Sequence, residues 1–122
     1  MPTLLISWND LETAETAKLQ QQRAGGHADE LETSIILALR PDLVHMDRAV
    51  TDYHGEPGPS APGYQPGGYS RDPKSPEYST TGVTGDAKLA TAEKGRKALA
   101  IMDAQLILAL RAFASAKIAD GR

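Results

Sequence analysis

One histidine and three carboxylates lie together between Gly26 and Ser34, in the sequence GHADELETS. Zinc, manganese and iron accept imidazole nitrogen and carboxylate oxygen as ligands, and the same groups act as acids and bases in catalysis. His27 follows two glycines, which let the backbone approach a ligand closely. The segment is therefore a candidate metal or acid–base site, without a complete ligand set of its own. The alternative is an exposed, inert histidine beside a helix start.

The carboxylates begin a helix that is predicted to cover residues 28–40, because Pro41 disfavours helical backbone in the residue before it. Its apolar residues at helical spacing are Leu31, Ile35, Ile36, Ala38 and Leu39. Glu32 falls on this apolar face, where a charge is costly unless it is paired, so it is a candidate buried ligand or acid. The alternative is a first-turn carboxylate that favours the helix dipole, with its stem bent to solvent. Asp29 and Glu30 are expected to be solvated first-turn charges, with Glu30 nearer the edge of the apolar face.

The other polar clusters are weaker candidates. His45 and Asp47 form one pair, and His54 lies near Asp52 and Glu56; surface positions are expected for both clusters. The serines have no nucleophile-elbow context, and the glycines at 63–68 have no P-loop lysine and follow no strand. Neither a serine hydrolase nor a phosphate-binding loop is supported.

Composition favours a small globular domain that does not bind nucleic acid. The chain has 122 residues and a formal net charge of −3, and its lysines and arginines are scattered. It contains no cysteine, so disulfides and thiolate metal sites are excluded. The N-terminus lacks the basic start of a signal peptide, and no apolar run is long enough to cross a membrane. We therefore expect a cytoplasmic protein with no nucleic-acid or membrane partner.

Hydrophobic periodicity and turn residues predict the elements around the site. Leu4–Ile6 favours a buried strand, Asp10 is expected to cap a helix over residues 11–23, and Gly25 helps to stop it. Residues 51–80 are rich in glycine, proline and tyrosine, and the tyrosines favour an ordered loop. The prediction is one or two strands and three helices, and a sheet of so few strands is not stable on its own. The chain is therefore predicted to be part of an α/β unit.

The last third is predicted to be one long helix over residues 87–116, with Asp86 as its cap. Gly95 is expected to allow close packing against a neighbour. The apolar stripe of this helix consists of Leu99, Met102, Leu106, Ala109, Leu110 and Phe113. The rest of the sequence supplies little surface to cover that stripe.

The segment His27–Ser34 resembles the His-Ala-Gly-Glu-x-Glu-Thr-Ser motif of the creatininase (creatinine amidohydrolase) family. An apolar helix and LRPDLV at residues 39–44 follow it, as in that family. GVTGD at residues 82–86 and ATAEKG at residues 90–95 resemble a second family block, Gly-Asp-Pro…Ala-Thr-Ala-Glu-Lys-Gly. The two blocks have the family's order and the resemblance covers nearly the whole chain. Asp29 stands where the family has glycine, and Ala87 follows Asp86 where the family has proline.

The resemblance implies a partial creatininase-like α/β/α layered fold with a mostly parallel sheet, of which residues 1–122 are the C-terminal portion and hold mainly helices. Family members are considerably longer, and their N-terminal half brings a Glu-x-His…Asp ligand set and a His-Gly-Asn-type loop. Neither motif is present in this chain. The implied cofactors are two divalent metal ions per complete site: zinc, manganese or iron. The implied partners are that missing half, neighbouring subunits of an oligomer (commonly a hexamer) and a small amide substrate.

The resemblance also implies roles for residues at matching positions. The implied reaction is hydrolysis of a cyclic or linear non-peptide amide C–N bond, formamides included, by metal-activated water. His27 matches the family's catalytic histidine, which moves a proton between the water and the leaving nitrogen. Glu32 matches the glutamate at or next to the metals, and Glu30 is either an acid–base group or a group that orients the ligands. The usual tryptophan before the histidine is absent, which weakens creatinine itself as the substrate.

A non-enzymatic function stays open beside this one. The unmatched apolar stripe of the last helix is typical of a surface that binds another chain. In that interpretation the protein is a non-catalytic remnant or an oligomerisation module, which uses its C-terminal helix to bind a partner or a second copy of itself.

Overall fold

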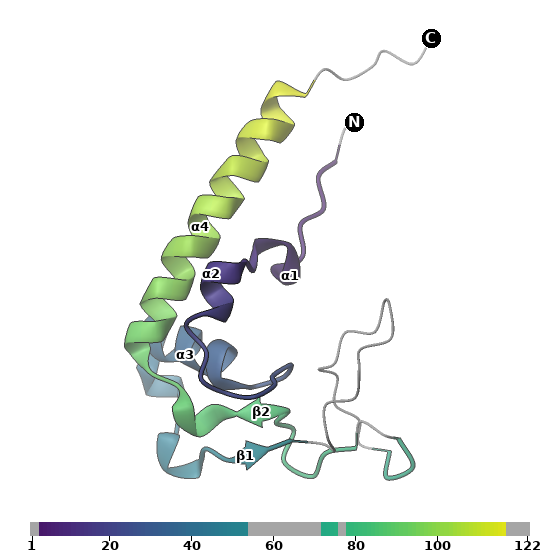
Figure 1. The fold of residues 1–122 in the computed structure, drawn as a ribbon, viewed down its shortest axis with the longest axis vertical. Helices are drawn as coiled ribbons and strands as arrows, with labels where there is room; N and C mark the ends of the chain where they lie inside the picture. The colour runs from purple at the N-terminus through teal and green to yellow at the C-terminus, as the bar shows by residue number, and fades with distance from the viewer. Residues whose placement is uncertain (1–2, 54–71, 76–77, 117–122) are drawn as a thin grey trace.

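The computed structural model of the protein describes residues 3–53, 72–75 and 78–116. The long helix α4 (Ala92–Ser115) is the spine of the molecule. The other helices and a small sheet gather along its N-terminal half, and its C-terminal half extends past them (Figure 1). The chain has an α/β fold that consists mainly of helices, as the sequence predicts.

Helix α3 (Glu30–Leu39) packs against α4 and forms the core of the molecule with it. Leu31 and Ile35 of α3 meet Ala98 and Met102 of α4 in one buried cluster. The helices approach closely at Gly95, where an added Cβ would lie 1.9 Å from the carbonyl oxygen of Ser34. The prediction that Gly95 permits close packing is therefore confirmed.

The buried face of α3 differs from the predicted one. Leu31 and Ile35 are buried, but Ile36 is 43% exposed and Leu39 is 58% exposed. Glu30, which was expected at the solvated edge, is buried together with Ser34. The difference arises because α4 covers only one side of α3. Ile36 follows the buried Ile35 by one residue, and the 100° turn per residue moves its side chain away from that side. The helix bounds themselves match the prediction to within two residues, and Arg40 ends the helix before Pro41.

The N-terminal prediction is wrong in detail. Residues 4–6 form no strand with any other described segment, and Leu5 is 90% exposed. In place of one helix over residues 11–23, two single-turn helices occur, α1 (Trp8–Leu11) and α2 (Ala14–Ala17). Ser7 caps the first helix, and Thr13 caps the second through bonds from the backbone of Glu15 and Thr16. A capping residue has an extended backbone and lies just outside its helix. Thr13, which caps α2, therefore interrupts the predicted helix over residues 11–23.

The described sheet consists of two short antiparallel strands, β1 (Thr51–Asp52) and β2 (Gly85–Asp86). This number of strands agrees with the prediction, while the mostly parallel sheet of the complete fold is not represented among the described residues. Within the described segments, three 3-10 helices link the elements: η1 (Pro41–Leu43), η2 (Met46–Arg48) and η3 (Ala87–Leu89). Asp86 caps η3, and Thr91 in its place caps α4. The long helix therefore begins five residues later than predicted, after a 3-10 turn.

Most of the glycine-, proline- and tyrosine-rich segment lies outside the described residues, including His54, Tyr64 and Tyr69. Of its tyrosines that are described, Tyr53 lies under the guanidinium of Arg23, 4.4 Å from the ring centroid. This cation–π contact ties the start of the segment to the chain that precedes the candidate site.

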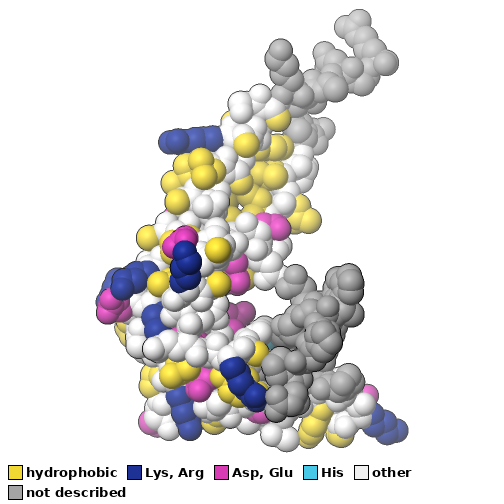
Figure 2. Space-filling view, viewed as in Figure 1, with side chains coloured by type: hydrophobic (Ala, Val, Ile, Leu, Met, Phe, Trp, Pro, Cys, Tyr) yellow, Lys and Arg dark blue, Asp and Glu magenta, His cyan; other side chains and the backbone are white. Residues whose placement is uncertain are grey.

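The C-terminal half of α4 leaves apolar side chains in solvent (Figure 2). Its exposed large residues are Ile107, Leu108, Leu110 and Phe113. By length and composition alone, α4 is apolar enough to cross a membrane, with only 11% of the relevant stretch buried. The expectation that no apolar run is long enough to cross a membrane is therefore wrong by length and composition. Such a run is weak evidence for a membrane span, since core helices pass the same test.

Candidate functional site

His27 lies at the junction of the two sequence blocks. Its backbone N–H donates to the carbonyl oxygen of Thr84 at 3.3 Å, and the Thr84 N–H donates back at 2.8 Å. This bridge is antiparallel, as is the pairing between β1 and β2. Ala28 then adopts a φ of 48°, which turns the chain from the bridge into α3. The half-buried histidine is therefore fixed through its backbone by the second block.

Glu32 is half-buried and holds this turn in place. Its Oε2 accepts a hydrogen bond from the Ala28 N–H at 2.7 Å, and its Oε1 makes no hydrogen bond with a described residue. The expectation that Glu32 faces the core is wrong, because the buried side of α3 carries Glu30 and Leu31. Glu32 instead fits the alternative of a first-turn carboxylate, and its Oε1 is the oxygen that no described residue bonds.

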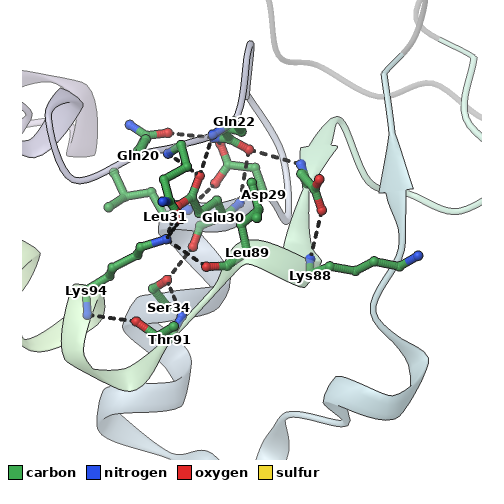
Figure 3. Close-up of polar contacts among 12 residues, drawn as sticks. Gln20, Gln22, Asp29, Glu30, Leu31, Ser34, Lys88, Leu89, Thr91 and Lys94 are labelled. Carbon is green, nitrogen blue, oxygen red and sulfur yellow. Dashed lines mark hydrogen bonds and ion pairs between the residues drawn. The ribbon is translucent and has the colours of Figure 1, made fainter.

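Glu30 is the buried carboxylate of the site (Figure 3). None of its surface is exposed. Its Oε2 accepts hydrogen bonds from the backbone N–H groups of Gln21 and Gln22, each at 2.7 Å, and its Oε1 forms an ion pair with Lys94. Both oxygens are therefore bonded, which satisfies the requirement that a buried charge be paired and hydrogen-bonded.

Lys94 completes this network from the first turn of α4. Besides Glu30, its Nζ donates to the carbonyl oxygen of Leu89 and to the side-chain oxygen of Gln21, both at 2.9 Å. Three acceptors use all three ammonium hydrogens. The ion pair joins the GHADELETS segment to the ATAEKG segment, so the two blocks that carry the family resemblance are one structural unit.

Gln22 and Ser34 add further bonds between the same segments. Oε1 of Gln22 accepts the backbone N–H groups of Glu30 at 3.2 Å and Asp86 at 3.0 Å. The Ser34 hydroxyl donates to the Glu30 carbonyl at 2.6 Å and accepts the Thr91 N–H at 3.0 Å. The roles of Gln22 and Lys94 were missed from the sequence, since no local pattern marks the Gln22–Asp86 and Glu30–Lys94 contacts, whose partners lie 64 residues apart.

Two exposed ion pairs border these helices. The guanidinium of Arg40 forms two hydrogen bonds with Asp42 and lowers the pKa of that carboxyl, while the carboxylate raises the pKa of Arg40. The Lys97 ammonium likewise lowers the pKa of Glu93 in the first turn of α4. Both pairs lie in solvent and contribute little to stability.

The weaker candidate residues do not join the site. His45 and Asp47 are exposed, and neither side chain forms a hydrogen bond with a described residue. His54 lies outside the described residues. Over residues 3–53, 72–75 and 78–116, no group of three or more histidine, aspartate or glutamate side chains is arranged to hold a metal ion. The described part of the chain therefore does not form a complete metal centre.

Comparisons with known proteins identify relatives of this arrangement. The family model for creatininase, described as creatinine amidohydrolase, matches residues 2–110. No curated protein sequence matches the chain at a significant level. Among solved structures, a creatininase mutant in complex with creatine is 26% identical, with a TM-score of 0.64 over 89% of this chain. A zinc-containing creatininase mutant and a manganese creatininase are each 25% identical, with TM-scores of 0.65 over 89% of this chain.

The chain spans 41–42% of the length of these creatininases. The matched region includes both sequence blocks, the His27–Thr84 bridge and the Glu30–Lys94 ion pair. The family model covers far more than half of the chain and agrees with the fold similarity. The protein therefore belongs to the creatininase family of amidohydrolases.

Proposed function

We propose that this chain supplies the proton-transfer part of a metal-dependent amidohydrolase that cleaves a small non-peptide amide C–N bond. The observation that carries the proposal is the bridge between His27 and Thr84, which assembles both family blocks around one histidine. The substrate class includes cyclic and linear amides and formamides. The solved relatives that contain zinc or manganese make these the first metals to test.

His27 is the proposed proton carrier. An imidazole can take a proton from water and return it to the leaving nitrogen, and both steps require a fixed ring position. The paired backbone bonds with Thr84 restrain the Cα, while the glycine before His27 leaves room beside it. The contribution of this chain is therefore a positioned acid–base group.

Glu32 is the proposed residue nearest the metals. Its bond from the Ala28 N–H orients the carboxylate and leaves Oε1 for a ligand. A divalent metal, when bound, activates water and polarises the amide carbonyl. Because the described residues do not form a full ligand set, the remaining ligands are proposed to come from a second polypeptide or a preceding region.

Glu30 is proposed as a positioning residue. Its carboxylate is fully engaged by Lys94 and by two backbone N–H groups, which favours an orienting role over proton transfer. It would act by holding the chain that leads to His27 against α3 and α4.

The proposal is tested by complementation. The unmatched portion of a solved creatininase is fused before residue 1 or co-expressed with this chain, and the purified complex is assayed with zinc or manganese against creatinine, other cyclic amides and formamides. We expect hydrolysis that requires both polypeptides and is lost after chelation. The unmatched portion alone is the control. A stable, metal-loaded complex that hydrolyses none of these amides would contradict the proposal.

A further inference from the structure

The side chain of Gln22 joins the two segments that form the His27–Thr84 bridge. Its Oε1 accepts the backbone N–H of Glu30, which follows His27 by three residues, at 3.2 Å. The same oxygen accepts the backbone N–H of Asp86, which follows Thr84 by two residues, at 3.0 Å. One oxygen atom therefore links both strands of the bridge.

The amide nitrogen of Gln22 bonds to the residue that caps α3. Its Nε2 donates to Oδ2 of Asp29 at 2.9 Å, and Oδ1 of Asp29 accepts the N–H groups of Leu31 and Glu32 (Figure 3). Asp29 is buried, so its carboxylate depends on these donors in place of water. Because Oε1 of Gln22 already accepts two N–H groups, the amide orientation is fixed and Nε2 faces the carboxylate. These two side chains form the Gln22–Asp29 clasp.

Two glycines leave the space that the clasp fills. A Cβ at Gly25 would lie 2.1 Å from Nε2 of Gln22 and 2.2 Å from Oδ2 of Asp29. A Cβ at Gly85 would lie 2.6 Å from Oε1 of Gln22 and 2.7 Å from Cβ of Asp29. Non-bonded atoms normally stay about 3.5–4.0 Å apart. The backbone before His27 and the backbone after Thr84 therefore both pack directly against the clasp.

We infer that Gln22 is a positioning residue for His27, which acts through the Gln22–Asp29 clasp on the bridge with Thr84. The catalytic consequence of this inference rests on the proposed function. The clasp contacts the chain before His27, the chain after it and the opposite strand, so opening of the bridge would disrupt the clasp. A fixed backbone gives the imidazole a fixed origin, which proton transfer between water and a leaving nitrogen requires.

The ion pair of Glu30 with Lys94 has a different part in this arrangement. The Glu30 carboxylate bonds to the backbone N–H groups of Gln21 and Gln22 and to Lys94 of α4. It therefore anchors the backbone from which the clasp extends. The clasp itself contacts both strands of the bridge, so its loss should affect the bridge more than the core between α3 and α4.

Amide hydrogen exchange of the full chain, measured by NMR, tests the inference without any turnover. Gln22→Leu removes both hydrogen-bonding groups of the side chain, whereas the acceptors of the His27 and Thr84 N–H groups are backbone oxygens that the variant keeps. We expect exchange of these two amides to accelerate roughly tenfold or more, through local opening of the bridge. The amides of Ile35 and Met102 in the core should change by less than about threefold.

An exchange of donor and acceptor tests the clasp itself. Gln22→Glu places two carboxylates against each other, and Asp29→Asn places two amide nitrogens against each other, so each should accelerate exchange at the bridge. In the double variant Gln22→Glu/Asp29→Asn, the introduced carboxylate accepts from the introduced amide, and an oxygen still caps α3. The double variant keeps the net charge and should restore exchange at the bridge to within roughly threefold of the wild-type chain.

Gln105→Leu is the matched control, because it makes the same change in α4 at a side chain that forms no hydrogen bond with a described residue. Exchange at His27 and Thr84 should stay unchanged in it. Equal acceleration of core and bridge amides in Gln22→Leu, or loss of its fold by circular dichroism, would assign the clasp to overall stability and overturn the inference. Unchanged exchange at the bridge would overturn it too, as would a double variant that does not recover.

Turnover of the complemented, metal-loaded protein tests the catalytic consequence. Gln22→Leu should lower kcat roughly tenfold with KM and metal content unchanged, because the displaced group is His27, and the double variant should recover it. If the wild-type complemented protein has no turnover, the proposed function fails, while hydrogen exchange still decides the inference. If it is active and Gln22→Leu has the same kcat, the inference fails and the proposed function stands.

Discussion

Glu30 holds a full charge in a position with no exposed surface. The cost of removing that charge from water is offset by Lys94 and by the N–H groups of Gln21 and Gln22. A buried pair is weak evidence of net stabilisation, but removal of one partner leaves the other uncompensated. Glu30 and Lys94 are thus expected to behave as a unit.

Replacement of one partner tests this coupling. Glu30→Gln leaves the Lys94 ammonium unpaired and should lower the free energy of unfolding by about 3–5 kcal/mol. The double variant Glu30→Gln/Lys94→Met should lose much less than the sum of the two single losses. Urea denaturation measures all three. Losses that simply add would show that the two residues do not interact.

Glu32→Gln is the matched comparison at the neighbouring carboxylate. It keeps an oxygen that can accept the Ala28 N–H, and Glu32 is only half-buried, so we expect a loss of no more than about 1 kcal/mol. In the complemented protein, Glu32→Ala should lower the metal content measured by atomic absorption, since a ligand is removed. Unchanged metal content would assign Glu32 to the turn at Ala28 alone.

The sequence predicted a buried carboxylate in this segment but assigned Glu32 to the interior, whereas the structure buries Glu30. Helical spacing gives the angle between Glu30 and Glu32, but it does not tell which angle faces a neighbour. That choice depends on α4 and on the backbone at Gln21 and Gln22, which are distant or irregular in sequence. The family resemblance implies a role for His27 that stays a prediction; it depends on residue identity and order, which do not require knowledge of the packing.

At the scale of elements, the contact between α3 and α4 depends on one small residue. Gly95 lies where a Cβ would overlap the backbone of Ser34, and a backbone atom cannot move aside as a side chain can. The spacing of apolar residues predicted both helices, and Pro41 marked the end of α3, but the start of α4 was predicted five residues too early because Asp86 caps η3 and Thr91 caps α4. The short N-terminal elements were predicted poorly, since caps such as Ser7 and Thr13 decide them locally.

Gly95→Ala tests this close approach. Alanine favours a helix by about 1 kcal/mol over glycine, so an exposed position would be stabilised. At Gly95 we expect the opposite, a net loss of about 1–3 kcal/mol in the free energy of unfolding, because the methyl group overpacks the interface. Chemical denaturation at constant m-value provides the measurement. A stabilised variant would show that the helices are farther apart than described.

At the scale of the whole molecule, the elements cover α4 on one side and along one half only (Figure 1). The described core consists of a few residues around Leu31 and Met102, and the chain spans 41–42% of its solved relatives. The exposed half of α4 is apolar surface that no described element covers. The sequence predicted this, because the apolar stripe of the last helix exceeds what the other elements can cover.

The turnover of the complemented, metal-loaded protein with and without His27 tests the central claim most directly. If His27 carries the proton, His27→Ala should lower the rate constant for amide hydrolysis by about 10²–10⁴-fold while metal content and circular dichroism stay unchanged. Equal turnover in the variant and the parent protein would contradict the assignment of this chain to the proton-transfer part of the site.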